Sequence, residues 1–216
     1  MRPTVRTTTF IDISPVLSPR TAVFPGDKQF ERRISRDYAQ GSTYLLSSID
    51  TTVHLGAHTD APNHYHAQGA DIASRPLDRY YGKCQVISVS LPRSARILPE
   101  HFEDIPIQAR KILFKTGSFP NPDQWNGDFN SLSPETIRYL SRQGVHLVGI
   151  DTPSVDPADD AQMLTHQAIY AHDLAILEGV VLDQAPDGIY RLIALPLRIE
   201  GADASPVRAV LMKDIE

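Results

Sequence analysis

The stretch HLGAHTDAPNH, residues 54–64, places three histidines and one aspartate within eleven positions. Neutral imidazoles and carboxylates are ligands that zinc and neighbouring divalent metals accept. A straight strand would separate the Cα atoms of His54 and His58 by about 13 Å, too far for comfortable joint ligation. One helical turn or a loop bent at Gly56 would bring them together. Because Pro62 stops a regular helix from continuing, we expect a bent loop that presents four side chains to one pocket: His54, His58, Asp60 and His64.

Two other interpretations of these residues compete with a zinc-type site. A polar surface loop with incidental histidines is the simpler one, and the concentration of histidines around one aspartate disfavours it. The other is a non-haem iron site in which His58, Asp60 and His166 are the three ligands. Such oxygenases with a keto-acid co-substrate generally need a basic residue shortly after the last histidine. The next basic residue after His166 is Arg191, which lowers this alternative without eliminating it.

Two later residues are further ligand candidates, His166 and Glu178. On one continuous helix, twelve residues would separate them by about 18 Å, so they could not share a site. The sequence indicates a break instead, because the helical pattern ends near His172 and LAILEGVVLD looks extended. A returning chain could bring Glu178 beside His166. An exposed acid before the turn glycine Gly179 is an equally good interpretation of Glu178 alone.

Five β-branched or apolar runs predict strands: 84–91, 111–117, 145–151, 191–199 and 207–212. The run 145–151, VHLVGID, is apolar on both parities up to Asp151, which is typical of a strand covered on both faces. Asp151 ends that strand, where α/β proteins tend to place functional groups. It could orient a ligand histidine or cap the turn that follows.

Helix signals precede the 145–151 strand. Ser133 can cap the stretch SPETIRYLSRQG, Pro134 suits its first helical position, and Gly144 can terminate it. A second helix is expected from about 161 to 172. Helix followed by buried strand indicates an α/β fold, and the length predicts one domain over residues 1–216.

Composition bounds the class of protein. The net charge is -5, which gives no electrostatic footprint for nucleic acid or an anionic membrane. The single cysteine, Cys84, excludes an internal disulfide and lies in an apolar run, so we expect a buried, inert thiol in a reducing cytosol. No apolar signal segment or run of about 20 apolar residues is visible, so a cytoplasmic protein is expected.

Four motifs stand out together: HLGAHTDAPNHY, GIDTPSVDP, AILEG with His166 twelve residues before its glutamate, and LIALPLRIEGADASPVRAVLM. Together they resemble the bacterial kynurenine formamidase (arylformamidase) family of cyclase-like metal-dependent hydrolases. The H-x-x-x-H-x-D-x-P-x-x-H core is shared with isatin hydrolases, whereas DTPSVDP and the DASPVRAVL tail favour the formamidase branch. The resemblance extends over nearly the whole chain, from about residue 13 to 212.

The resemblance implies a fold, a reaction and a set of roles. The fold is a swivelling β/β/α domain with a mixed central sheet, usually a homodimer. The reaction is hydrolysis of N-formyl-L-kynurenine to L-kynurenine and formate, in tryptophan catabolism. The implied cofactors are two divalent ions per subunit, Zn²⁺ first, with Mn²⁺ and Co²⁺ also accepted by such ligands. The implied residues are His54, His58 and Asp60 on the first ion, Asp60 and His166 on the second, bridging Glu178, and His64 as catalytic acid/base.

One residue departs from the family pattern. Members usually have a tryptophan in PVWPGD that contacts the aromatic substrate, whereas this chain reads AVFPGD with Phe24 at that position. Phenylalanine can stack, but with less area and without an indole N–H. Phe24 therefore keeps a cyclic amide such as isatin open as the substrate. The sole tryptophan, Trp125, is expected to be a structural or interface anchor.

An amide hydrolase must activate water, stabilise an oxyanion and protonate the leaving nitrogen. Two divalent ions can supply the first two functions, and His64, with an ordinary pKa near 6.5, suits the proton transfers. His66 could line the entrance, but a solvated loop position is favoured. A metal-binding module without catalysis is the alternative outside enzymes, and His64 beside a complete ligand set argues against it.

Overall fold

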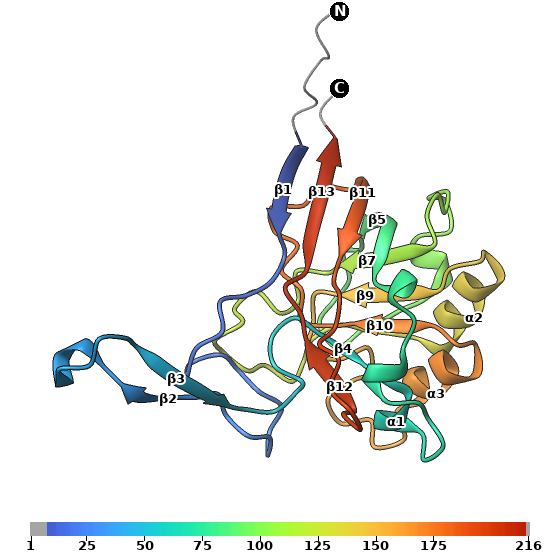
Figure 1. Ribbon diagram of the computed structural model, residues 1–216. Coiled ribbons are helices and arrows are strands. Elements are labelled where there is room, and N and C mark those ends of the chain that lie inside the picture. The colour runs from blue at the N-terminus through green and yellow to red at the C-terminus, as the bar shows by residue number, and fades with distance from the viewer. Residues whose placement is uncertain (1–7, 215–216) are drawn as a thin grey trace, which may run out of the picture.

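A computed structural model describes residues 8–214, and its centre is a seven-stranded sheet of order β1-β13-β11-β5-β7-β9-β10 (Figure 1). Four neighbouring strands run parallel: β5 (Tyr81–Ser88), β7 (Lys111–Lys115), β9 (Leu147–Ile150) and β10 (Ala175–Leu177). The other three are antiparallel: β11 (Gly188–Ile193), β13 (Val210–Asp214) and β1 (Thr8–Asp12). The predicted α/β fold with a mixed central sheet is confirmed.

Both faces of the sheet are buried at the parallel strands β7, β9 and β10, which explains why these strands are apolar at successive positions. In β7, Ile112 and Phe114 pack into the cluster that contains the helices, whereas Leu113 packs into the cluster on the opposite face. The helices α2 (Pro134–Arg142) and α3 (Leu164–Ala171) cover the first of these faces. This parallel part of the sheet is therefore an internal layer whose strand ends are its accessible parts.

The helix predicted over 133–144 is confirmed as α2. The Ser133 side chain accepts a hydrogen bond from the Thr136 N–H at 3.1 Å, and Gly144 takes a left-handed φ of 78° after the last turn. The second helix begins at Leu164, later than the predicted 161. The preceding residues form turns, and Met163 has a left-handed φ of 49°, which no helix accommodates.

Two strand predictions were wrong in extent. The run 191–199 forms a strand only to Ile193, and Pro196 beyond it has no N–H to donate to a ladder. The run 207–212 is a strand only from Val210, where β13 begins. Residues 207–209 connect β13 to the separate strand β12 (Ala204–Pro206), which belongs to another sheet.

Several smaller elements complete the fold. Strand β12 pairs antiparallel with β4 (His58–Asp60), and α1 (Pro62–Tyr65) follows directly. Strands β6 (Arg96–Ile97) and β8 (Ser131–Leu132) form a further pair. Four short 3₁₀ helices complete the described elements: Tyr38–Gln40, Ile72–Ser74, Leu77–Arg79 and Pro99–His101.

A hairpin of β2 (Glu31–Arg36) and β3 (Leu46–Asp50) projects from the body of the protein (Figure 1). Nearly all of its residues are exposed, including Ile34 and Ile49. Among residues 8–214, no helix has the length and hydropathy needed to cross a bilayer.

Candidate metal centre and its pocket

Strand β4 lies against the end of β10 at a point where Gly56 and Gly179 are in close contact. His58 and Glu178 exchange main-chain hydrogen bonds of 3.1 and 2.9 Å, which makes them a directly opposed antiparallel pair. Gly179 allows this approach, because a Cβ at that position would lie 2.1 Å from the Gly56 carbonyl oxygen. Gly56 itself has a φ of 57° and turns the chain between His54 and His58. The expected bend at Gly56 is present.

Opposed residues of an antiparallel pair project to the same side, so the His58 and Glu178 side chains meet. His58 Nε2 lies 3.1 Å from Glu178 Oε2 and 3.6 Å from Asp60 Oδ1. His166, from the first turn of α3, places Nε2 3.3 Å from Asp60 Oδ2 and 3.8 Å from Glu178 Oε1. All four side chains are 3% exposed or less. The returning chain thus brings Glu178 beside His166.

The two carboxylates divide their oxygens between two groups of histidines. Asp60 Oδ1 faces His54 Nδ1 at 3.0 Å and also His58, whereas its Oδ2 faces His166. Glu178 likewise turns Oε2 to His58 and Oε1 to His166. Both carboxylates therefore lie between a His54–His58 side and a His166 side.

His54 and His64 share a partner that follows from the pairing of β12 with β4. Asp203 lies just before β12, and its main-chain oxygen accepts a hydrogen bond from the Ala61 N–H at 2.8 Å. Its Oδ2 lies 3.0 Å from His54 Nε2 and 3.3 Å from His64 Nδ1. The His64 side chain is 29% exposed, so it reaches both the buried ligands and the solvent.

Neighbouring acceptors fix which ring nitrogen of each buried histidine is free. His58 Nδ1 lies 2.8 Å from the Gly56 carbonyl oxygen, which can only accept, so Nδ1 carries the hydrogen and Nε2 presents its lone pair. Asp156 Oδ2 lies 2.7 Å from His166 Nδ1 and has the same effect on His166 Nε2. In both residues the free nitrogen faces Asp60 and Glu178.

The donor set fits divalent metal ions. Asp60 is 2% exposed, and its Oδ1 contacts His54 Nδ1 at 3.0 Å without forming a hydrogen bond of acceptable geometry, so this buried oxygen has the capacity to bind a cation. Ligand atoms about 2.1 Å from a tetrahedral ion are about 3.4 Å apart, and the contacts above run from 3.0 to 3.8 Å. Two sets of donor atoms lie within 4.8 Å of one another: His54, Asp60 and His64, and His58, Asp60 and Glu178.

The electrostatics of the metal-free protein show how strongly these carboxylates attract positive charge. Burial alone would lower the pKa of His166, but the carboxylates of Asp156, Asp60 and Glu178 raise it to about 10. Burial likewise opposes the charged form of His54, yet Asp60 and Asp203 raise its pKa to about 10. The site has excess negative charge that protons or metal ions neutralise.

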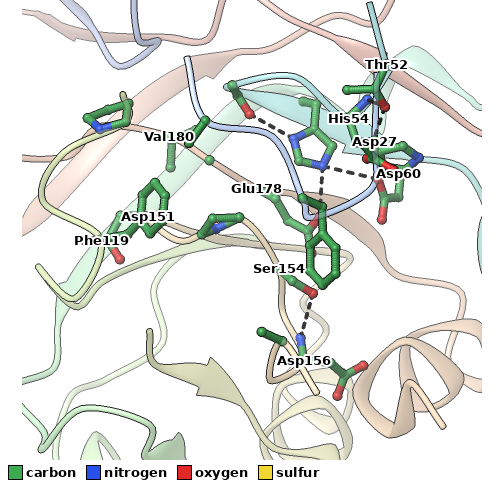
Figure 2. Close-up of a pocket in the computed structure, with 18 of the residues that line it drawn as sticks. Asp27, Thr52, His54, Asp60, Phe119, Asp151, Ser154, Asp156, Glu178 and Val180 are labelled. Atoms are coloured by element: carbon green, nitrogen blue, oxygen red, sulfur yellow. Dashed lines mark hydrogen bonds and ion pairs between the residues drawn. The ribbon is translucent and has the colours of Figure 1, made fainter. Parts of the chain in front are cut away.

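The candidate ligands line a cavity of about 800 Å³ at the carboxyl edge of the parallel strands. His54, His58, Asp60, His64, His166 and Glu178 all contribute to its lining. Figure 2 shows Asp27 and Thr52 beside His54 and Asp60, with Phe119 at another part of the wall. Ligand sites of α/β proteins commonly occupy this edge.

Phe24 lines the same cavity and is 37% exposed. Its ring packs edge-on against Trp125 with centroids 4.9 Å apart, and Trp125 in turn contacts Phe119 and Phe129. The pocket therefore has an aromatic wall, formed by Phe24 and Phe119, with Trp125 supporting Phe24.

The structure distinguishes between the alternatives left open for the other residues. Asp151 accepts hydrogen bonds from the N–H groups of Thr116 and Gly117, so it holds the turn after β7 rather than the turn that follows its own strand, and its hydrogen-bond partners within residues 8–214 include no histidine. The His66 ring stacks on the Tyr170 ring with centroids 3.8 Å apart, and His66 lies outside the lining of the cavity. Cys84 is buried, and burial raises the pKa of its thiol to about 12.

Two residues that contact the candidate ligand histidines were missed by reasoning from the sequence, Asp156 and Asp203. Each lies in a stretch that carried the family resemblance, DTPSVDP and DASPVRAVL, but neither stands near a histidine in the chain. Asp156 precedes His166 by 10 residues and Asp203 follows His54 by 149. The only signal in the sequence was that each aspartate lies within one of the motifs that carry the family resemblance.

Known proteins with this fold include metal-dependent hydrolases. One solved structure, "Potential Metal-Dependent Hydrolase With Cyclase Activity", is 28% identical, with a TM-score of 0.82 over 97% of this chain and 100% of that one. A "predicted metal-dependent hydrolase from Bacillus stearothermophilus" is 27% identical, with a TM-score of 0.81 over 95% and 98%. Isatin hydrolase A from Labrenzia aggregata, 22% identical with a TM-score of 0.80 over 95% and 93%, shares the fold.

The family model described as "Putative cyclase" matches residues 11–157, more than half of the chain and including the stretch from His54 to His64. The mixed sheet, the ligand-type side chains at its carboxyl edge and the similar solved structures all point to the same family. The chain belongs to the cyclase family and has the fold of its metal-dependent hydrolases.

Proposed function

We propose that this protein is a metal-dependent arylformamidase that hydrolyses N-formyl-L-kynurenine to L-kynurenine and formate. The observation that carries the proposal is the division of the Asp60 and Glu178 oxygens between two groups of histidines, at the base of an aromatic-walled pocket. Family membership supports a hydrolase, and the formamidase motifs of the sequence support this substrate.

The two sides of the carboxylates suggest two divalent ions. In this proposal His54, His58 and Asp60 would hold one ion, Asp60 and His166 would hold the other, and Glu178 would be a ligand to both. Zinc suits this mixture of imidazole and carboxylate ligands, and manganese or cobalt would also be accepted. Bound at this site, the ions would lower the pKa of a coordinated water and polarise the formyl oxygen.

His64 is the proposed acid/base. Because its Nδ1 lies against the Asp203 carboxylate, that nitrogen carries the hydrogen and Nε2 remains available as a base. Nε2 takes a proton from the attacking water as the new C–O bond forms at the formyl carbon. The same proton then passes to the departing anilide nitrogen as the C–N bond breaks, which leaves formate and the free aryl amine.

The pocket wall supports an aromatic substrate. Phe24 and Phe119 can contact an aryl ring, while the formyl group, whose carbon carries only hydrogen, reaches the confined site among buried ligands. Bulkier acyl groups would meet the closely packed side chains of His54, His58 and Glu178. Selectivity for formyl over acetyl amides is therefore part of the proposal.

A related function, the opening of a cyclic amide such as isatin, is the second candidate. The observations that favour it are Phe24 at the usual tryptophan position and the fold shared with isatin hydrolase A. Both reactions attack an amide carbonyl beside an aryl nitrogen. They differ in whether the nitrogen departs from a formyl group or remains attached after ring opening.

The test is an assay of zinc-loaded protein with N-formylkynurenine and with isatin, following formate release and the absorbance change of each substrate. We expect equimolar formate and kynurenine and two ions per chain by elemental analysis. Activity on isatin alone would replace the proposal with the second candidate. Metal-loaded protein that is inert on both substrates and on a panel of simple formanilides would indicate a metal-binding module without catalysis.

We further propose that the protein works as a cytoplasmic homodimer in tryptophan degradation. Its single cysteine is buried and unpaired, which suits a reducing compartment. The projecting β2–β3 hairpin offers apolar side chains to a second copy. No nucleic acid or membrane is needed by this function.

A further inference from the structure

The ring of His54 is turned the opposite way from the rings of the other two candidate ligand histidines. In His58 and His166 an acceptor of the protein holds Nδ1, and Nε2 faces the shared carboxylates. In His54 the acceptor is Asp203 Oδ2, and it holds Nε2 at 3.0 Å. Nδ1 is then the nitrogen that faces Asp60, 3.0 Å from its Oδ1.

The geometry of these two contacts indicates which nitrogen of His54 carries the hydrogen. The contact between Nε2 and Asp203 has the geometry of a hydrogen bond, whereas the contact between Nδ1 and Asp60 has the same length without that geometry. Because an ionised carboxylate can only accept, the hydrogen belongs on Nε2, and Nδ1 presents its lone pair. Nδ1 and Asp60 Oδ1 are then two acceptors that face each other in a buried site, and a shared cation stabilises such a pair.

The same oxygen of Asp203 also holds the proposed acid/base. It lies 3.3 Å from His64 Nδ1, and the rings of His64 and His54 have centroids 4.2 Å apart. A carboxylate oxygen has two lone pairs, so it can accept from both rings at once. The pairing of β12 with β4 fixes this oxygen, because the Asp203 main chain accepts from the Ala61 N–H. A candidate metal ligand and the acid/base are therefore attached to one atom.

We propose that Asp203 is a positioning residue that orients His54 to bind metal through Nδ1 and fixes His64 beside it through the same oxygen. The orientation of His54 is independent of the reaction, whereas the effect through His64 rests on the proposed function. Among residues 8–214, Asp156 holds one ring only, that of His166. Loss of Asp203 should therefore impair both metal binding and proton transfer, and loss of Asp156 only the first.

Nitrogen NMR of the zinc-loaded protein measures the ring orientations directly. With ¹⁵N-labelled histidine, long-range correlations from the carbon-bound ring protons distinguish Nδ1 from Nε2 and show which of them carries hydrogen. Once each ring is assigned through its backbone signals, we expect hydrogen on Nε2 in His54 and on Nδ1 in His58 and His166. Hydrogen on Nδ1 in all three rings would overturn the proposal.

Asp203→Ala tests the joint role. The Asp203 side chain is 46% exposed, so its truncation leaves the core intact. We expect zinc affinity to fall by about 10- to 100-fold. At saturating zinc, kcat for N-formylkynurenine should stay about 10- to 100-fold below that of the wild type, with little change in KM, because His64 is no longer held in place. Unchanged zinc affinity, or a kcat that saturating zinc restores fully, would overturn the joint role.

Three further variants show whether the effect belongs to this carboxylate. Asp203→Asn keeps an oxygen at the same position and should recover part of both losses. Asp156→Asn should weaken zinc binding but regain kcat at saturating zinc. The matched control is Glu200→Gln: Glu200 is an exposed acid in the turn before Asp203, outside the pocket lining and without an ion pair among residues 8–214. This control should change neither zinc affinity nor kcat.

The NMR and zinc-binding measurements separate this proposal from the proposed function. Hydrogen on Nε2 of His54, together with weaker zinc binding in Asp203→Ala, supports the orienting role of Asp203 even if no formamide is hydrolysed, in which case only the function fails. Hydrolysis of N-formylkynurenine by a protein whose His54 carries its hydrogen on Nδ1 would retain the function and overturn the orientation.

Discussion

Asp156 holds His166 from two directions. Its Oδ2 lies 2.7 Å from the ring Nδ1 and accepts a hydrogen bond from the His166 main-chain N–H at 3.0 Å. The same carboxylate accepts a hydrogen bond from the Thr165 N–H, so it also caps the start of α3. One side chain therefore sets the position of the helix, the orientation of the ring and the nitrogen that faces Asp60.

Asp156→Asn should weaken metal binding by about 10- to 100-fold, the usual cost of removing the partner of a metal-binding histidine. The amide can still accept from the helix N–H groups but no longer favours the hydrogen on Nδ1. Competition with a coloured chelator would measure the affinity. Asp160→Asn is the matched control, because Asp160 lies in the same loop and pairs with Arg96. Equal affinities of the two variants would refute the role given to Asp156.

His64→Ala should lower kcat by about 10²- to 10⁴-fold while the metal content stays close to that of the wild type. The reason is that His64 is the proposed proton carrier and is bonded to Asp203 rather than to the carboxylates of the ligand set. Steady-state kinetics and elemental analysis on the same preparation make the measurement.

The metal content is the decisive part of that experiment, because His64 also lies within ligand distance of His54 and Asp60. Loss of one ion per chain in His64→Ala would make His64 a ligand and leave the acid/base role unassigned. His66→Ala provides the control: His66 stacks on Tyr170 outside the pocket lining, and its removal should change neither metal content nor kcat.

The site was partly predictable because its ligand types lie close together in the chain. His54, His58 and Asp60 occupy seven positions around Gly56, and a bend there is the local conformation that lets them meet. Asp203 could not be placed in this way, since its contact with His54 depends on the pairing of β12 with β4. Pairing between strands far apart in the chain produces no characteristic spacing of residues from which such a contact could be predicted.

The fold was predictable where burial is two-sided or periodic. Strands such as β9 and the capped helix α2 carry strong local signals. The β2–β3 hairpin was not predicted, because the sequences ERRISR and LSSID have no apolar face that alternates with a polar one. Its position outside the core explains this lack of pattern.

Phe24→Ala should raise KM for N-formylkynurenine by about 3- to 10-fold with little change in kcat. The ring is part of the pocket wall and takes no part in the proposed proton transfers. An aromatic contact with the substrate contributes about 0.5–1.5 kcal/mol to binding. Phe24→Trp should restore or improve KM. Phe10→Ala, at an exposed ring outside the pocket lining, is the control. An unchanged KM in Phe24→Ala would remove Phe24 from the substrate site.

His146 should make the stability of the protein sensitive to pH. Its Nδ1 is buried without a partner in the described structure, and burial together with Lys111 and Arg110 lowers its pKa to about 4. The unfolded chain, with a pKa near 6.5, then binds a proton between these values that the folded protein does not bind. The contribution of His146 to the free energy of unfolding is therefore complete above pH 6.5 and falls as the pH decreases towards 4.

Urea unfolding of chelator-treated protein at pH 7.5, 5.5 and 4.5 measures this effect. The wild type should lose more stability over this range than His146→Gln, because the variant has no imidazole to titrate. His172→Gln, at an exposed histidine, should behave as the wild type does. Parallel pH curves for wild type and His146→Gln would show that His146 is protonated freely in the folded state.

The β2–β3 hairpin should hold two copies of the chain together. A two-stranded hairpin is marginally stable alone, and here Ile34 and Ile49 are 49% and 65% exposed on the side where Arg32 pairs with Ile49. Sedimentation should give about twice the 24.0 kDa mass of one chain. The double variant Ile34→Asp/Ile49→Asp should sediment as a monomer, because it places charge in the contact between the two copies. The control is Leu77→Asp, at an exposed leucine away from the hairpin, which should remain dimeric. A wild-type protein that sediments as a monomer at micromolar concentration would contradict this assignment of the hairpin.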